Sequence, residues 1–305
     1  MSELRNYLRY VRRITAALLL VGLSITLGCD DGDDNDEVVL ELDPESGGAF
    51  DVDAYSATAA ADSLTGLWLL VGNYDYLVDD SAVRGAGREL VRASVRIQDG
   101  DQLTFTSCYA GTPPQTPQRQ ADGSFTIELS GGVASLAPNA DNNRLTGSFV
   151  SNAGSIDFQG SVTLIRLSAD NSLGLGTMRV TSAALDEEAA LNVDCFFEAE
   201  QELADRTGTN DPNEIVIRLS NNNQQLLDLY VEGSATDQQL RIKALQGVGR
   251  DVNLEFITPS QAIGVNKAGV ADITISGSDP AGLQASLGAA EGDQQASVAV
   301  DIALP

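Results

Sequence analysis

The chain has 305 residues, with 44 Asp or Glu, 18 Lys or Arg and no His, which gives a formal net charge of −26 at pH 7. A surface this acidic repels nucleic acid, so we expect no nucleic-acid partner. Without histidine, Ser-His-Asp and Cys-His catalysis and nearly every zinc or copper site are excluded. We therefore expect no catalytic residue, no metal site and no cofactor.

The first 28 residues have the order of a secretory signal, in which a basic head precedes an apolar run. The basic residues are Arg5, Arg9, Arg12 and Arg13. The uncharged run from Ile14 to Gly28 is 15 residues long, whereas a membrane-spanning helix needs about 20. We expect residues 1–28 to be a signal peptide, and without them the chain would carry 14 basic and 43 acidic residues, a net charge of −29.

The signal ends in Thr26, Leu27, Gly28 and Cys29. This ending resembles the lipobox of bacterial lipoproteins, with Thr26 in place of the preferred Leu. The resemblance implies cleavage before Cys29, which then receives a diacylglyceryl group and an N-acyl chain. Two or three acyl chains anchor a protein stably in a bilayer, so the implied partner is a membrane of the bacterial cell envelope. The alternative is an ordinary cleaved signal with an incidental cysteine.

An acidic segment follows the cysteine. From Asp30 to Glu45 there are nine Asp or Glu and no Lys or Arg, a composition that repels itself and buries no core. We expect residues 29–61 to be a disordered tether. Asp30 resembles an inner-membrane retention signal and the acidic run resembles surface-export signals, and we favour the outer membrane. A calcium loop is an alternative, but the order of an EF-hand is not met around Gly32.

Two further cysteines, Cys108 and Cys195, remain in the chain. An even pair in an oxidising compartment is typical of a disulfide. We expect Cys108 and Cys195 to be bridged.

Alternation of apolar and polar residues predicts strands throughout residues 62–205. A hairpin is expected where Val91 to Ile97 is followed by Asp99-Gly100 and a return strand through Leu103 to Tyr109. Further strands are expected at 64–72, 125–129, 145–150, 156–167, 177–181 and 193–200. About eight antiparallel strands close into a barrel that holds side chains or one small ligand, so residues 62–205 are predicted to form an antiparallel β-barrel-like domain.

Gly66, Leu67 and Trp68 stand at the start of the first of these strands. They resemble the Gly-x-Trp motif of lipocalins, and the resemblance implies that Trp68 closes the base of a barrel. An Arg on the last strand that would stack on this Trp is missing, unless Arg206 serves. The alternative is a plain core Trp.

Arg84, Arg88, Arg92 and Arg96 are spaced by four. On a strand, even spacing places Arg88, Arg92 and Arg96 on one face, opposite Val91 and Val95. One interpretation is a solvated outer face on which the Arg side chains pair with carboxylates of neighbouring strands. The other is a cationic patch for a carboxylate or phosphate. With Trp68, these three Arg are the candidate ligand-binding residues.

From Asp211 onward, short strands alternate with turn signals over residues 211–305, which is typical of an immunoglobulin-like sandwich. The fold class expected for the whole chain is therefore all-β, with an antiparallel barrel-like domain followed by a smaller β-sandwich.

Two functions remain open. The first is a lipid-anchored envelope lipoprotein, non-catalytic, that acts as a scaffold or binds a small apolar ligand; its protein partners are not indicated. The alternative is a carboxylate-only hydrolase acting on glycans, since two Asp or Glu can do that chemistry without histidine. No pair of carboxylates stands out, and aromatic residues are 5% of the chain, so we favour the first.

Overall fold

The computed structural model describes residues 52–79, 84–107, 114–129, 132–153, 156–182, 185–205, 213–221, 224–233, 244–245, 251–257, 260–266, 270–276, 282–291 and 294–303. Within these ranges the chain is all-β, as predicted, and its only helical turn is the 3₁₀-helix η2 (Val52–Ala54). In the same ranges no helix has the length and apolarity needed to cross a bilayer. The predicted signal peptide, Cys29 and the acidic run lie outside the described residues.

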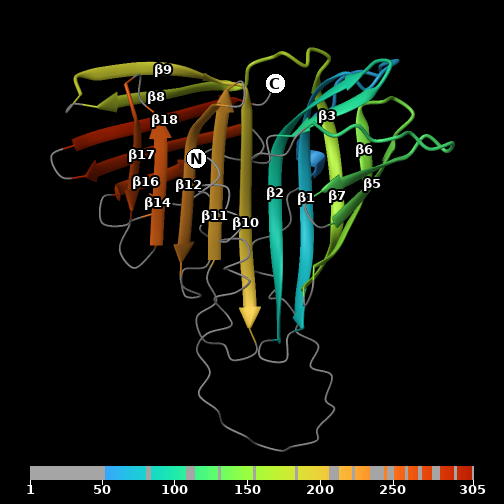
Figure 1. Ribbon diagram of the computed structural model, residues 1–305. Helices are drawn as coiled ribbons and strands as arrows, with labels where there is room; N and C mark the ends of the chain where they lie inside the picture. Colours follow the sequence, from blue (N-terminus) through green and yellow to red (C-terminus); the bar gives the residue numbers. More distant parts are fainter. Residues whose placement is uncertain are drawn as a thin grey trace, which may run out of the picture.

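Twelve strands form one antiparallel sheet (Figure 1). In sheet order they are β15 (Ala262–Asn266), β14 (Asp251–Ile257), β12 (Gln224–Gly233), β11 (Asn213–Asn221), β10 (Cys195–Asp205), β2 (Arg84–Asp99), β1 (Gly66–Asp79), β7 (Ile156–Ser168), β6 (Arg144–Ala153), β5 (Gly132–Pro138) and β4 (Phe125–Leu129), with β3 (Leu103–Ser107) also paired to β2.

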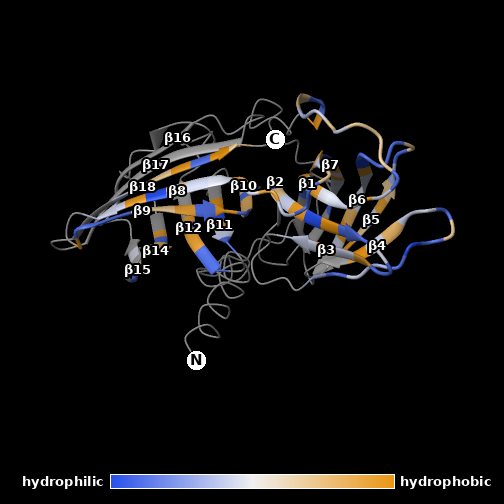
Figure 2. Cartoon of the chain, turned by 90° about the horizontal axis from the view of Figure 1, so that it is seen from above, coloured by the Kyte–Doolittle hydropathy of each residue, from blue (hydrophilic) through white to orange (hydrophobic). Residues whose placement is uncertain are grey.

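The second sheet has six strands. In sheet order they are β13 (Ala244–Leu245), β16 (Val270–Ser276), β17 (Gly282–Glu291), β18 (Gln294–Ala303), β8 (Gly176–Ser182) and β9 (Glu187–Val193). The smaller sheet covers one face of the β10, β11, β12 and β14 part of the large sheet, as the view from above shows (Figure 2).

The large sheet serves two apolar cores because its central strands are buried on both faces. Successive side chains of a strand point to opposite faces, and on β1 Leu67, Leu69 and Val71 join one core while Trp68 and Tyr74 join the other. We call the first the sandwich core, because it lies between the two sheets. We call the second the inner core, because β1 to β7 curl around it (Figure 2).

The curled half is not a continuous barrel ladder. Its two edges, β3 and β4, are connected through the segment at residues 114–120 by two isolated bridges, Phe105 to Gln115 and Arg119 to Phe125. The coarse prediction of antiparallel β-structure is confirmed, whereas a closed barrel goes beyond what these strands form.

The predicted boundary between residues 205 and 211 does not separate two units. β10 pairs with β2 on one edge and with β11 on the other, so one sheet runs across the boundary. β8 pairs with β18, close to the end of the chain. A sandwich does form, but it takes β8, β9 and β10 from the predicted first domain, because their apolar faces are buried against the C-terminal strands.

Each of the eight strands predicted before residue 205 lies on a strand, and the Val91–Tyr109 hairpin is confirmed as far as Ser107 by the β2–β3 register. β5 and β9 were not predicted. Their sequences, GVASLAP and EEAALNV, are rich in small or acidic residues that have low β-propensity. Pairing with β6 and β8 forms these strands despite that propensity.

The predicted disordered tether extends too far. Residues 52–65, which we call the strap, cross the end of the curled half before β1 begins, and Tyr55 and Leu64 are buried. The acidic run ends at Glu45, and the strap instead carries Val52 and Ala57, which pack against the sandwich core. Disorder is therefore wrong for the last ten residues of the predicted segment, 52–61.

Candidate functional site

Trp68 is fully buried at the strap end of the inner core, with 0% of its surface exposed. Its Nε1 donates a hydrogen bond to the Leu64 carbonyl at 2.9 Å. Val91, Val95 and Ile97 of β2 belong to the same core as Trp68.

Gly66 allows β7 to approach the start of β1. A Cβ at Gly66 would overlap the Ser168 carbonyl and lie 2.9 Å from Arg166 Nε. Arg166 stands opposite Trp68 in the β1–β7 register, is 5% exposed, and donates from Nη2 to the Thr65 carbonyl at 2.8 Å. The glycine of the Gly-x-Trp sequence is thus explained by close packing, and its neighbour is Arg166, which the sequence reasoning missed because it lies in the apolar run TLIRLS.

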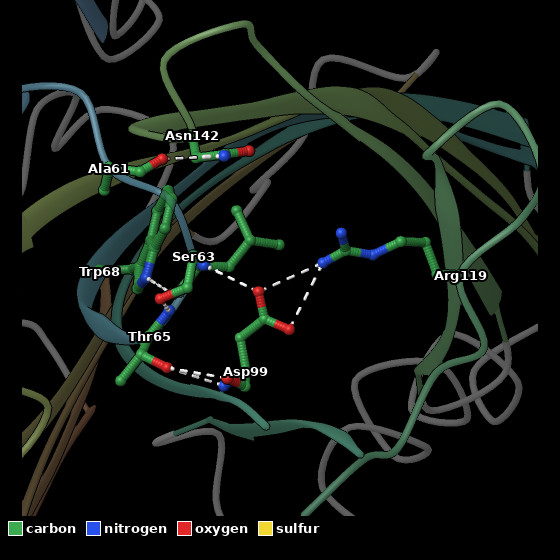
Figure 3. A network of polar contacts seen from close by, with 8 residues as sticks. Ala61, Ser63, Thr65, Trp68, Asp99, Arg119 and Asn142 are labelled. Atoms are coloured by element: carbon green, nitrogen blue, oxygen red, sulfur yellow. Dashed lines mark hydrogen bonds and ion pairs between the residues drawn. The ribbon is translucent and has the colours of Figure 1, made fainter. Parts of the chain in front are cut away.

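Asp99 organises the polar contacts at this end (Figure 3). The Leu64 amide donates to Asp99 Oδ2 at 2.9 Å, and the Asp99 amide donates to Thr65 Oγ1 at 2.9 Å. Arg119 forms an exposed ion pair with the same carboxylate at 3.3 Å. These contacts join the strap, the end of β2 and the segment that bridges β3 to β4.

Arg92 lies inside the molecule on the sandwich-core side of β2. It is 0% exposed, and its Nε and Nη2 donate to Glu198 Oε2 on β10, the residue opposite it in register. Its Nη1 donates to Tyr55 Oη at 3.1 Å, and its guanidinium carbon lies 5.8 Å from the centre of the Phe196 ring. Burial alone would lower the pKa of Arg92, but the charge of Glu198, together with Tyr55, raises it above its ordinary value.

The solvated outer face predicted for the three arginines is therefore wrong at Arg92, although its pairing with a carboxylate on a neighbouring strand is right. The side chains of Arg92 and Glu198 are 0% and 4% exposed, so the ion pair is enclosed. Glu198 and Tyr55 already accept hydrogen bonds from this guanidinium. It therefore does not present a free pair of N–H donors for bidentate binding of an added anion. The matched spacing of Arg88 and Arg92 with Glu198 and Glu202 was the sequence signal for this pairing, since both pairs are four apart on adjacent strands.

Arg96 and Arg88 have different surroundings. Arg96 donates to three carbonyls, those of Asn171, Leu173 and Asp194, and so closes the loop between β7 and β8 on the start of β10. Burial lowers the pKa of Arg96, with Asp194 and Asp170 opposing that shift. Arg88 is opposite Asp75 and Glu202 in register, and its side chain lies outside the described residues. The predicted cationic patch is thus not assembled by Arg92 and Arg96.

Cys195 begins β10 and is disulfide-bonded. Cys108 lies outside the described residues, one position beyond the end of β3. β3 and β10 occupy the same edge of β2, with Ser107 opposite Val95 and Phe197 opposite Ala93, so the end of β3 and the start of β10 meet there. This register supports the expected Cys108–Cys195 pairing.

In the part of the chain that the structure describes, no group of three or more His, Cys, Asp or Glu side chains could hold a metal ion. Comparisons of the chain with protein-family models, with curated proteins and with solved structures found no match.

Proposed function

We propose that this chain is a lipid-anchored lipoprotein of the bacterial cell envelope whose β-structure is a non-catalytic scaffold or holds a small apolar ligand. Residues 1–28 are the signal peptide, Cys29 carries the acyl chains, and the outer membrane is the favoured location. The acidic residues after Cys29 keep the following segment extended and solvated.

The observation that carries this proposal is the lipobox-like ending Thr26-Leu27-Gly28-Cys29 after a basic head and an apolar run. The strap shows where the described fold begins after the acidic run. The segment that follows the acidic run ends packed on both cores, through Tyr55 on one side and Leu64 on the other. An anchor at Cys29 would therefore connect to the folded part through a segment that packs on both cores.

We further propose that β1 to β7 act as one barrel-like module. All seven strands contribute apolar side chains to the inner core, together with Leu64 of the strap and Phe197 and Ala199 of β10. Phe105 and Phe125 are in contact at 5.2 Å between ring centres. An apolar interior filled by side chains is compatible with a scaffold role as it stands. It could hold a small apolar ligand if some of these side chains moved to open a cavity.

The anchor is tested by replacing Cys29 with Ser. The wild type should fractionate with membranes and incorporate labelled palmitate, and Cys29→Ser should incorporate none and appear in the soluble fraction. Thr26→Leu, which brings the sequence closer to the preferred lipobox, is the matched control and should remain on membranes. A Cys29→Ser protein that stays on membranes as tightly as the wild type would contradict the proposal.

The choice between scaffold and ligand holder is tested with Trp68, the one Trp of the chain. Native mass spectrometry of the protein purified from its host shows whether an apolar molecule is carried. Titration with palmitate should then shift or quench Trp68 emission if the inner core holds ligand. If Trp68 emission does not change and the native mass equals that of the protein without ligand, the scaffold role is favoured.

A further inference from the structure

The strap connects the two cores around one end of the sheet. It begins with η2, and the ring of Tyr55, 4% exposed, enters the sandwich core. Nine residues later Leu64, 1% exposed, enters the inner core. A short segment thus touches both faces of the large sheet.

Between these two residues the strap is held by loops and strand ends. The Thr58 amide donates to the Arg166 carbonyl and the Ala61 amide to the Asp141 carbonyl, both at 2.9 Å. From the β5–β6 turn, Asn143 Nδ2 donates to the Thr58 carbonyl at 2.7 Å and Asn142 Nδ2 to the Ala61 carbonyl at 2.9 Å. None of these contacts belongs to a strand ladder, so the strap can separate without breaking the sheet.

The two ends of the strap are attached differently. At the Tyr55 end, Arg92 Nη1 donates to the phenol oxygen, and Arg92 is itself held by Glu198. Arg144 Nη2 also donates to the Tyr55 carbonyl at 3.3 Å. At the other end, Trp68 Nε1 donates to the Leu64 carbonyl, and the Leu64 amide donates to Asp99 Oδ2 at 2.9 Å. Because Tyr55 accepts a hydrogen bond from a buried cation, its loss leaves a charged donor without that acceptor in a dry place, which is costly.

We propose that the strap is a hinged lid over the Trp68 end of the inner core, held shut by the hydrogen bond from Arg92 to Tyr55. Opening of the lid lifts Leu64 from the inner core and breaks its contact with the Trp68 indole. The contacts on opposite faces of the sheet therefore open together. This device requires neither the lipid anchor nor a ligand.

The test is amide hydrogen exchange of the full chain, read residue by residue by NMR. In the wild type, the amides of Thr58, Ala61 and Leu64 should exchange faster than the ladder amides of β1, such as Leu69, because the lid opens without unfolding the sheet. The chain has one Trp, so the Trp68 indole proton gives a single signal. It should exchange with solvent at the same rate as the strap amides. Equal rates for the strap and β1 would overturn the proposal, whichever variants fold.

Tyr55→Phe removes the phenol oxygen and keeps the ring. It should speed exchange of the strap amides and of the Trp68 indole by about tenfold or more, the effect of losing one hydrogen bond to a charged group. Thr58→Val is the matched control, because Thr58 Oγ1 is buried on the same strap and has no hydrogen-bond partner. It should leave these rates as in the wild type. A Tyr55→Phe protein that speeds the strap amides but not the indole would show that the two ends open separately, and would overturn the lid.

Discussion

At the scale of single residues, the Arg92–Glu198 pair is an enclosed ion pair between neighbouring strands. Both side chains are nearly without solvent, at 0% and 4% exposure. Two charges taken out of water stabilise a fold only when their geometry and further hydrogen bonds compensate for lost hydration. Tyr55 and the Phe196 ring supply part of that compensation.

We predict that Glu198→Ala lowers the free energy of unfolding by about 3–5 kcal/mol, because it leaves the Arg92 charge buried without its carboxylate. Urea denaturation measures this. Glu188→Ala is the control, since Glu188 pairs with Arg179 at 3.1 Å with both side chains about two-thirds exposed, and exposed pairs contribute about 0–1 kcal/mol. Equal losses in the two variants would show that enclosure of the inner pair has no energetic consequence.

At the scale of elements, two turns use the same local chemistry. In each, an Asp carboxylate accepts from the amide and the hydroxyl of a Ser two residues later: Asp122 with Ser124, and Asp170 with Ser172. The Ser hydroxyl and amide hydrogen bonds lower the pKa of both Asp residues below its ordinary value. Each turn is therefore more stable with its carboxylate ionised.

The sign of the pH dependence follows from these lowered pKa values. The stabilisation is present above the ordinary Asp pKa and is lost as the pH falls through the lowered pKa of the folded state. We predict that Ser172→Ala raises the pKa of Asp170 and leaves that of Asp122 lowered, measured by NMR titration of the carboxyl carbons. Ser124→Ala should have the reciprocal effect, and a shift of both Asp residues in either variant would contradict a local cause.

The β5–β6 ladder depends on Gly147, where the two strands come close. A Cβ at this position would overlap the Ser135 carbonyl of β5, a backbone atom that cannot rotate away. We predict that Gly147→Ala costs about 1–3 kcal/mol or more, the usual cost of forcing an extra group into a packed site. Gly100→Ala in the β2–β3 turn is the control, because nothing lies within 4 Å of its added Cβ. Thermal denaturation should separate the two variants.

At the scale of the whole molecule, one sheet passes through both cores, so we expect the two halves to fold together. The sandwich core draws residues from β1 and β10 as well as Ile217, Leu229 and Val300, which come later in the chain. The apolar face of β1 therefore shares its core with the C-terminal strands, and that part of the core is lost when they are absent.

We predict that a chain ending at Asp205 does not yield a folded barrel. Its sandwich core would lack the residues of the C-terminal strands, among them Ile217, Leu229 and Val300. The truncated chain should therefore aggregate, or show red Trp68 emission and no cooperative transition. The whole chain should unfold in one transition seen alike by Trp68 emission and by far-ultraviolet circular dichroism. A truncated chain with blue emission and sharp unfolding would restore the two-domain division.

The alternation of apolar and polar residues predicted most of the strands and part of the candidate site. The alternation from Val91 to Ile97 places the valines on the Trp68 face and the arginines on the other, and the structure has the same assignment. Gly66 and Trp68 were singled out through their resemblance to the Gly-x-Trp motif of lipocalins. The signal peptide, the acylated Cys29 and the Cys108–Cys195 bridge remain predictions from sequence.

What the sequence determined by itself is the strand character of each segment and the division of its residues between two faces, because side-chain direction along a strand is a local property with a period of two. Only the tertiary structure decided which face meets water. Arg92 is enclosed by Glu198, 106 residues away, and by Tyr55 on the strap. β8 pairs with β18, more than 100 residues later. Such partners are selected by the burial of complementary faces across the whole molecule. The residue pattern of a single strand therefore does not predict which distant strand or side chain it will contact.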